Sequence, residues 1–466
     1  MSKTYAGARL RRLREERNLS QAALARVLAI SPSYLNQMEH DSRPLTVPVL
    51  LRLTEAFGVD PTFFSSRDSA RLLADLRESL AEEIDQSRLS TSELSELVNR
   101  LPGVAEALLG LARHRQELSE RLTLAAGQRD QPDPDSTLAP HEHVRDFFYR
   151  RQNYLHQLDV GAEELATRLG VRRGEVRRVL TTRLADRHGV RLLLEDGGDQ
   201  LHRYDPETRV LRLSPRLRPG QQAFRMATQL GLLERDGELS ALAAEDFEEG
   251  SESWSLARIG AAHYFAAALV LPYAAFHARA EEFRYDIERL SDHFGLGYET
   301  VCHRLSTLQR PRLRGVPFSF VRVDRAGNLS KRQSATDFHF SRSGGTCPLW
   351  NVYEAFASPG RVQVQVAEMP DGRRYLWTAR TVGRPGPVWG QPGKTFVIGL
   401  GCELRHAHRL VYSTGLDLDE PAATPIGMGC RACERLGCPQ RSVPSLGRRL
   451  AVDENRTTFV PYPVVP

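Results

Sequence analysis

The 466-residue sequence lacks a hydrophobic run long enough to cross a bilayer. Its longest apolar stretch, residues 261–276, is interrupted by His263 and Pro272 and falls short of the roughly 20 residues that a membrane helix needs. The start of the chain is basic and polar, without the apolar segment of a secretory signal peptide. These absences argue against an integral membrane protein and predict a cytoplasmic location with no membrane partner.

A large excess of charge of one sign is also missing. The formal net charge is +5, with 26% charged and 41% hydrophobic residues, so the chain can bury several cores and is not a general polyanion binder. The length predicts about three domains. The few surplus positive charges are concentrated in one predicted helix near the start, where they can neutralise phosphates: Arg9, Arg11, Arg12, Arg14 and Arg17.

Cysteine is scarce, with six residues in the chain. In a reducing compartment, closely spaced cysteines indicate metal or redox chemistry and not structural disulfides. Cys430, Cys433 and Cys438 have C-x2-C-x4-C spacing, which lets the thiolates reach one metal centre, and a closed site needs a fourth ligand. We expect Cys402 to be this ligand, with Cys347 as the alternative. Four thiolates suit either zinc or an iron–sulfur cluster, and the spacing does not choose between them.

Residues 20–39 predict two short helices joined by a tight turn. Ser20 and Ser31 are suited to cap these helices, because a side-chain oxygen can accept a free backbone N–H of the first turn. Pro32 follows at the first helical position, where its missing N–H costs nothing. A basic amphipathic helix precedes the pair, and the whole has the layout of a helix-turn-helix DNA-binding unit.

In such a unit the second helix presents its N-terminal residues to base edges in the major groove of double-stranded DNA. Gln37 can bond bidentately to adenine, Ser33 tolerates several bases, and Tyr34 can reach a thymine methyl or a phosphate. Polar residues beside this face suit phosphate oxygens. A helical bundle with an ordinary polar surface is the alternative interpretation. The predicted DNA-binding residues are Arg11, Gln21, Ser31, Ser33, Tyr34, Asn36 and Gln37.

Residues 7–64 resemble the XRE/lambda-repressor-type helix-turn-helix family throughout. The resemblance rests on the segments LRRLREERNLSQAALA, SPSYLNQMEH and VPVLLRLTEAFGVDPTFF.

The helical period continues through residues 70–111, where apolar positions alternate with charged faces, so these helices need a partner surface. A dimerisation segment is the favoured interpretation, because helix-turn-helix units usually read two half-sites as a dimer; a cap on the next domain is the alternative. We therefore expect a homodimer or a higher homo-oligomer. Residues 128–140 are polar and proline-rich and are predicted to be a linker.

The middle of the chain is mostly helical, with a predicted hairpin within residues 189–213 and helices at 222–235 and 254–270. The segments AFRMATQLGLLE and AAHYFAAALVLP resemble the zinc-peptidase-like domain of the ImmA/IrrE family. A working version would carry H-E-x-x-H on the first helix, but this chain has TQLGL at 228–232. We therefore expect the fold without the catalysis, and expect His263 and His277 to be packing or surface residues.

Residues 282–309 predict another helix pair that imitates a DNA-binding motif, but its apolar residues look like core and favour a structural role. Cys302 on this segment is expected to be a buried thiol. Beyond Pro311 the chain alternates as strands, with one hairpin in VPFSFVRVD and LSKRQS and another around PDG, followed by the strand TFVIGLGCEL. These strands predict an α+β domain.

Several segments together resemble the bacterial short-chain fatty acyl regulator family: FRYDIERLSDHFGLGYETVCHRLSTLQRP, RGVPFSFVRVDRAGNLSKRQSA, CPLWNVYEAF, GCELRHAHRLVY and CRACERLGCPQRS. The resemblance implies a transcriptional regulator of acetate- or propionate-type metabolism, with CoA or a short-chain acyl-CoA as effector and a [4Fe-4S] cluster in place of zinc. The chain departs from the family pattern at residues 441–445, directly after the cysteines.

An acyl-CoA effector needs cations for its phosphates and an apolar slot for its acyl end. The predicted ligand-binding residues are Lys331, Arg332, Trp350, Arg405 and Arg409. Two other functions stay open: a redox-sensing DNA binder that uses the cluster alone, and a metallopeptidase of the ImmA type, which the missing H-E-x-x-H disfavours. No catalytic residues are predicted.

The predicted architecture is multidomain. An all-α lambda-repressor-like helix-turn-helix domain occupies residues 1–66, and a helical connector and linker occupy 67–140. An α-rich, degenerate zinc-peptidase-like domain follows at 141–311, and an α+β sensor domain with the cysteine cluster occupies 312–466.

Overall fold

The computed structural model describes residues 7–464 except 18, 41, 58–66, 81–90, 128–139, 199, 337, 339–345, 385, 387, 388, 431, 432 and 446–448. Contacts divide the chain into two compact units. The first unit comprises Met1–Leu138, Asp337–Gly344 and Met428–Pro466, and the second comprises Ala139–Thr336 and Gly345–Gly427. The predicted linker at 128–140 lies almost wholly outside the described residues.

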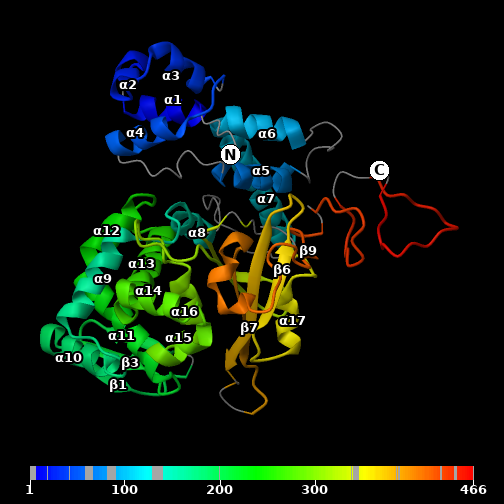
Figure 1. Cartoon of the computed structure of the whole chain (residues 1–466). Helices are drawn as coiled ribbons and strands as arrows, with labels where there is room; N and C mark the ends of the chain where they lie inside the picture. The colour runs from blue at the N-terminus through cyan, green and yellow to red at the C-terminus, as the bar shows by residue number, and fades with distance from the viewer. Residues whose placement is uncertain are drawn as a thin grey trace. The chain divides into compact units, whose positions relative to one another are not determined.

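The first unit begins with the helix-turn-helix, drawn in blue in Figure 1. The buried residues Leu10, Leu24, Leu35 and Leu53, one from each helix, share a small core. Gly7 allows the first helix to lie against the end of the third, because a Cβ at this position would be 2.5 Å from the carbonyl oxygen of Met38. The four helices are α1 (Gly7–Glu16), α2 (Gln21–Val27), α3 (Pro32–Glu39) and α4 (Val47–Phe57).

Three further helices follow in the first unit: α5 (Arg67–Leu80), α6 (Thr91–Arg100) and α7 (Pro102–Gly127). They bury a second core of Leu76, Val98, Ala105 and Leu109. Proline at the first position of α7 separates it from α6. The sequence predicted apolar helical faces through residues 70–111; the structure places Leu76 in this core and Leu97 against it, and leaves Leu101 and Leu111 exposed.

The second unit contains the mainly helical middle of the chain, drawn in green in Figure 1. The predicted hairpin in residues 189–213 is part of a three-stranded sheet of order β1-β3-β2, in which β3 pairs antiparallel with β2 and parallel with β1. The helices are α8 (Pro140–Arg150), α9 (His156–Arg168), α10 (Val176–His188), α11 (Pro219–Glu234), α12 (Asp236–Ala244), α13 (Glu252–Val270), α14 (Tyr273–Glu282), α15 (Ile287–Phe294) and α16 (Tyr298–Leu305). The strands are β1 (Arg191–Leu194), β2 (His202–Asp205) and β3 (Val210–Leu213).

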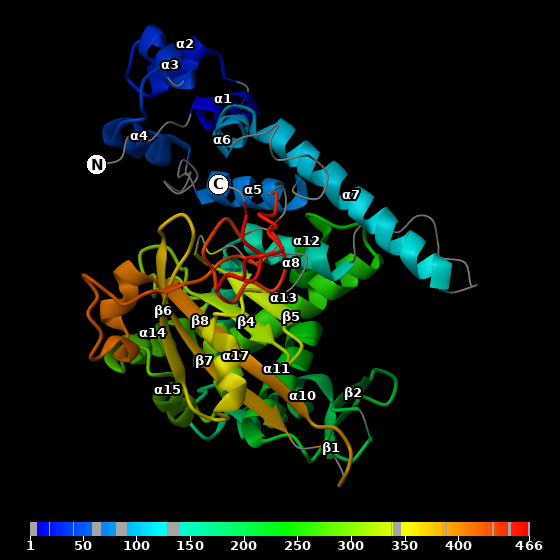
Figure 2. The ribbon, with the colours of Figure 1, turned by 90° about the vertical axis from the view of Figure 1, so that its right-hand side faces the viewer.

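A six-stranded sheet of order β5-β4-β8-β7-β6-β9 completes the second unit. Both predicted hairpins are present, since β4 pairs antiparallel with β5 and β6 with β7. Figure 2 shows α17 lying across one face of this sheet. The elements are β4 (Ser319–Val323), β5 (Leu329–Ser334), α17 (Asn351–Ala357), β6 (Gln363–Glu368), β7 (Arg374–Arg384), β8 (Lys394–Glu403), the 3-10 helix η3 (Leu404–Arg409) and β9 (Thr424–Pro425).

One hydrophobic core joins the helical part of the second unit to the sheet. It contains Leu165 of α9, Phe265 of α13 and Leu305 of α16, together with Phe320 of β4 and Leu400 of β8. The predicted boundary at residue 311 therefore falls inside a shared core. The multidomain fold class is confirmed: an all-α helix-turn-helix, a helical middle region and a C-terminal region with mixed sheets.

Within the described ranges, no single helix has the length and apolar composition to span a membrane. The helices α13 and α14 pass that test only as a pair bent by 65°. Most of the apolar half of α13 is buried in the core of the second unit.

Candidate DNA interface and sensor sites

The recognition helix α3 is built as its sequence predicts. The hydroxyl of Ser31 accepts a hydrogen bond from the backbone N–H of Tyr34 at 3.1 Å, and Ser20 caps α2 in the same way. The turn between the helices uses Ala29 with a φ of 49°. Arg52 of α4 holds this turn by donating to the carbonyl oxygens of Leu28 at 2.6 Å and Ala29 at 3.2 Å.

The polar face of α3 is accessible. Leu35 and Met38 are buried against the other helices, whereas Ser33 and Asn36 are exposed. Tyr34 and Gln37 are half-buried, and the guanidinium of Arg43 lies 5.4 Å from the centre of the Tyr34 ring. Ser31 is exposed at the N-terminus of the helix. The structure therefore gathers the predicted α3 residues on one side of the helix.

A buried carboxylate, which the sequence reading missed, links this face to α1 and α2. Glu39 is 2% exposed and pairs with Arg14, whose Nε lies 2.7 Å from Oε1. Gln21 donates to Glu39 Oε2 at 2.7 Å and to Asn36 Oδ1 at 3.1 Å. Arg11 donates to the carbonyl oxygen of Glu39 at 3.2 Å. Three of the predicted DNA-binding residues therefore also hold the three helices together.

The second helix pair, which imitates a DNA-binding motif, has its recognition-like helix in the core. Val301, Cys302 and Leu305 of α16 are fully buried, and Arg304 is 0% exposed. Burial raises the pKa of the Cys302 thiol well above its usual range. A structural role for this pair and a buried Cys302 are therefore confirmed.

The cysteine loop of the first unit is organised by one arginine. Arg441 is 4% exposed and donates to the carbonyl oxygens of Cys430 at 2.7 Å, Cys433 at 3.1 Å and Arg435 at 2.5 Å. The backbone N–H of Ser442 donates to the Cys430 sulfur at 3.4 Å. A buried cation and an N–H group near sulfur fit a centre built from negatively charged thiolates.

The proposed fourth ligand lies in the other unit. Cys402 is on β8, opposite Leu376 of β7, and its side chain is part of the hydrophobic core. Burial raises the pKa of this thiol, and the neighbouring Glu403 adds to the shift. Cys347 is 7% exposed in the same unit. Among the described residues, no three histidine, cysteine, aspartate or glutamate side chains are grouped as a metal ion would need. The ligand set stays a prediction.

The predicted effector residues do not form one cluster. Lys331 pairs with Arg322 across β4 and β5, and Arg322 donates to Glu299 of α16 at 3.0 Å. Lys331 therefore lies on the face of the sheet that packs against α16. Trp350 packs edge-on against Trp377, with ring centres 4.8 Å apart.

Trp377 and Val352 of α17 meet beside Gly399 on the opposite face of the sheet, and Arg332 shares that face because it pairs with Val321. Arg405 is exposed and lies 2.8 Å from Glu403, whereas Arg409 contacts Glu281 and donates to Tyr285 at 3.2 Å.

The remnant of the peptidase site lies between α11 and α13. Thr228 and Gln229 occupy the positions of the first ligand and the base, and both are buried, at 5% and 4% exposure. The Thr228 hydroxyl donates to the carbonyl oxygen of Phe224 at 2.9 Å. One turn earlier, Arg225 lies 3.4 Å from Nε2 of His263 on α13. A guanidinium therefore stands close to where a metallopeptidase would keep a cation.

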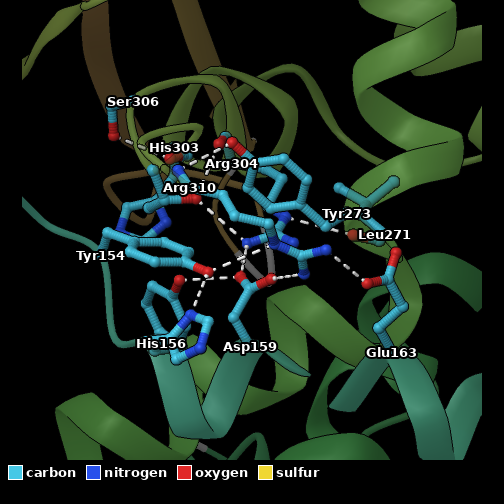
Figure 3. A network of polar contacts seen from close by, with 12 residues as sticks. Tyr154, His156, Asp159, Glu163, Leu271, Tyr273, His303, Arg304, Ser306 and Arg310 are labelled. Carbon is cyan, nitrogen blue, oxygen red and sulfur yellow. Dashed lines mark hydrogen bonds and ion pairs between the residues drawn. The ribbon is translucent and has the colours of Figure 1, made fainter. Parts of the chain in front are cut away.

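A buried ion network, absent from the sequence prediction, ties α9 to α16 and the segment after it (Figure 3). Asp159 is 0% exposed and accepts from Arg304 at 2.7 Å, Arg310 at 2.8 Å and the Tyr264 hydroxyl at 2.7 Å. Arg310 also reaches Glu163 at 2.7 Å. Burial alone would raise the pKa of Asp159, but Arg304 and the hydrogen bonds hold it below its usual value.

Together, the capped recognition helix with its accessible polar face and the peptidase-like fold without its H-E-x-x-H residues define a class: a helix-turn-helix DNA-binding regulator. Comparisons with known proteins agree. A helix-turn-helix domain matches residues 6–62, an IrrE N-terminal-like domain matches 185–306, and the "Short-chain fatty acyl coenzyme A regulator, C-terminal" family matches 307–462.

Similar proteins extend over almost the whole chain. The HTH-type transcriptional regulator RamB of Mycobacterium tuberculosis is 58% identical over 99% of both chains, and PrpR of the same organism is 50% identical over 99% of this chain and 96% of its own. The propionyl-CoA carboxylase regulator of Cereibacter sphaeroides is 43% identical over 99% of both.

A solved Mycobacterium tuberculosis transcriptional regulator, 53% identical, covers 70% of this chain and 100% of its own with a TM-score of 0.68. The chain belongs to the short-chain fatty acyl coenzyme A regulator family of helix-turn-helix transcriptional regulators. These relatives are named as regulators and not as enzymes, and the assignment of the chain as a transcriptional regulator is confirmed.

Proposed function

We propose that the protein is a cytoplasmic transcription factor that controls genes of acetate- or propionate-type metabolism in response to a short-chain acyl-CoA. The observation that carries this proposal is the accessible face of α3 on a chain whose C-terminal region matches the acyl-CoA regulator family. The name of the propionyl-CoA carboxylase regulator supports the metabolic assignment.

Base reading is assigned to the first two turns of α3. Gln37 and Ser33 have the chemistry to bond base edges, and the Ser31 cap presents the N-terminus of the helix to phosphates. Arg11 and Gln21 are partly committed to Glu39. Their contribution to DNA binding therefore includes positioning of α3 as well as phosphate contact.

A second copy of this chain is proposed to pack against α7. Leu101, Val104, Leu108 and Leu111 recur at helical spacing and are 54%, 47%, 36% and 68% exposed. They form a stripe next to the face that carries Ala105 and Leu109, which are buried in the core of the unit. Two DNA-reading heads need a dimer, and a continuous apolar stripe in the same unit supplies a symmetric surface for it.

A metal centre at Cys430, Cys433 and Cys438 is part of the proposal. The Arg441 guanidinium and the Ser442 N–H support a centre of thiolates, and the family resemblance favours a [4Fe-4S] cluster over zinc. Cys402 stays the first candidate for the fourth ligand. When bound, such a cluster would supply a redox-sensitive structural element, and this chain's own residues would hold its loop.

The test is operator binding by the full-length chain. A DNA fragment obtained by binding selection is titrated with protein in the presence and absence of acetyl-CoA or propionyl-CoA. A change in DNA affinity with either acyl-CoA supports the proposal. A response to removal of the metal but to no acyl-CoA would favour the alternative, a redox-sensing DNA binder; no sequence preference in the selection would contradict DNA reading by α3.

A further inference from the structure

A group of cationic and imidazole side chains occupies the helix–sheet region where a peptidase of this fold would hold its metal. Arg225 extends from α11, three residues before Thr228, and contacts His263 of α13 with 3.4 Å between Nη1 and Nε2. His202 comes from β2. Burial lowers the pKa of its ring, and Arg225 lies close enough to lower it further. All three side chains are half-buried, so the group is reachable from solvent.

The positive charge of Arg225 has no counterion nearby. Across the residues that the structure describes, no carboxylate lies within 4.0 Å of its guanidinium, and its one hydrogen-bond contact is with His263. His202 adds a buried Nε2 atom that has no hydrogen-bond partner. A buried polar atom without a partner is costly, and an acceptor that carries negative charge would suit both the free nitrogen of His202 and the unpaired charge of Arg225.

A second cation lies near enough to the same histidine to lower the pKa of its ring. Lys331 of β5 helps to lower the pKa of both His263 and His303, and its Nζ lies 5.9 Å from the centre of the Phe320 ring. The carboxylate that faces it, Glu299, is already paired with Arg322 at 3.0 Å. The site therefore holds the two positive charges of Arg225 and Lys331, and the one nearby carboxylate, Glu299, is shared with Arg322.

This arrangement does not suit a metal cation. Arg225 and Lys331, both of which add to the lowering of the His263 pKa by burial, would repel a divalent ion through their positive charges. An oxyanion has the opposite preference, because guanidinium and ammonium donors bind phosphoryl oxygens with strong, charge-assisted hydrogen bonds. Loss of the H-E-x-x-H residues together with the presence of Arg225 reverses the sign of the charge that the site attracts.

We propose that Arg225, His263, His202 and Lys331 form a binding site for a phosphoryl oxyanion in the former metal position of the peptidase-like domain. Its two possible sources are free phosphate and the phosphoryl groups of a CoA nucleotide. The second source rests on the proposed acyl-CoA response.

The test measures binding to the full-length protein by calorimetry, with inorganic phosphate, CoA and acetyl-CoA as separate probes. Arg225→Gln removes one cation and should weaken binding about 10- to 100-fold, the value of one hydrogen bond to a charged group. Arg178→Gln is the matched control, because Arg178 is an exposed arginine of the same unit; it should leave the affinity unchanged. His202→Phe keeps a ring on β2 without its nitrogen atoms and should weaken binding about tenfold.

The outcomes separate the two sources. If phosphate and CoA compete and Arg225→Gln weakens the binding of both, the site exists and holds a phosphoryl group of CoA. If only phosphate binds and Arg225→Gln weakens that binding, the site exists and holds free phosphate. CoA or acetyl-CoA binding that both variants leave unchanged would overturn the site while the acyl-CoA response stands. No binding of any probe by the unmodified protein would overturn the site, and operator titration with acyl-CoA would still decide the proposed function separately.

Discussion

Removal of the buried carboxylate of Asp159 is expected to destabilise the second unit strongly. In Asp159→Asn the volume is kept, but Arg304, which is 0% exposed, loses the carboxylate oxygen 2.7 Å from its Nη1. Arg310 keeps Glu163 at 2.7 Å, so the loss falls mainly on Arg304. An uncompensated buried charge costs about 3–5 kcal/mol. The exposed carboxylate in Glu245→Gln, which pairs with Arg151, should change stability by less than about 1 kcal/mol.

Tryptophan fluorescence can follow this unit alone. All four tryptophans of the chain, Trp254, Trp350, Trp377 and Trp389, lie in the second unit, so urea unfolding monitored at these residues reports its stability. The pKa of Asp159 is lowered in the folded state, so its stabilising contribution is present above the unfolded pKa and is lost as pH falls through the lower folded value. The difference between Asp159→Asn and the unmodified protein should shrink only in that acidic range. A loss below about 1 kcal/mol at neutral pH, equal to that of the surface control, would refute the reasoning.

Four further predictions test the other sites. Gln37→Ala should relax base preference at one operator position and cost about 1–3 kcal/mol on the selected site; an unchanged preference in a binding selection would contradict the assignment of α3. Leu111→Glu should shift the full chain toward monomer in light scattering, whereas Leu194→Glu, an exposed leucine of the second unit, should not. Cys430→Ser and Cys402→Ser should each lower the metal content measured by elemental analysis, with Cys302→Ser as the unaffected control; full metal in Cys402→Ser would move the fourth ligand elsewhere. Burial lowers the pKa of Lys331 to about 8, with Glu299 raising and Arg322 lowering it; His263 and His303 are the neighbouring titratable groups. Phosphate affinity should therefore fall as pH rises through that value, and Lys331→Arg should remove this fall.

The sequence predicted those features that depend on near neighbours in the chain. The Ser20 and Ser31 caps, the start of α3 at Pro32 and the hairpin of β4 and β5 follow from local patterns, and each is present in the structure. Such patterns are reliable because a cap or a tight turn is decided within a few residues.

Long-range placement could not be read in the same way. Lys331 and Trp350 are close in sequence and were expected in one site, yet strand alternation and the position of α17 place them on opposite faces of the sheet. The Asp159–Arg304 pair joins residues 145 positions apart, and single charged residues on amphipathic helices are usually solvent-exposed. One local signal for Glu39 existed: a carboxylate directly after the buried Met38 in a helix that faces a basic one.

A ligand at the proposed phosphoryl site would act on the chain where its two units are covalently joined. Arg225 and His263 belong to helices, and Lys331 belongs to the edge strand β5, so one bound anion would contact both halves of the shared core. After β5 ends at Ser334, the chain passes at Asp337 from the second unit into a segment of the first. A ligand shifts an equilibrium only by its different affinity for two states, typically about 1–3 kcal/mol of coupling. Contacts to Lys331 that differ between two positions of β5 would supply such a difference, whereas contacts confined to α11 and α13 would give binding without a response at the DNA. Lys331→Gln should therefore reduce the acyl-CoA effect on operator binding by a larger factor than it reduces acyl-CoA affinity, and an equal loss of both would place the coupling outside β5.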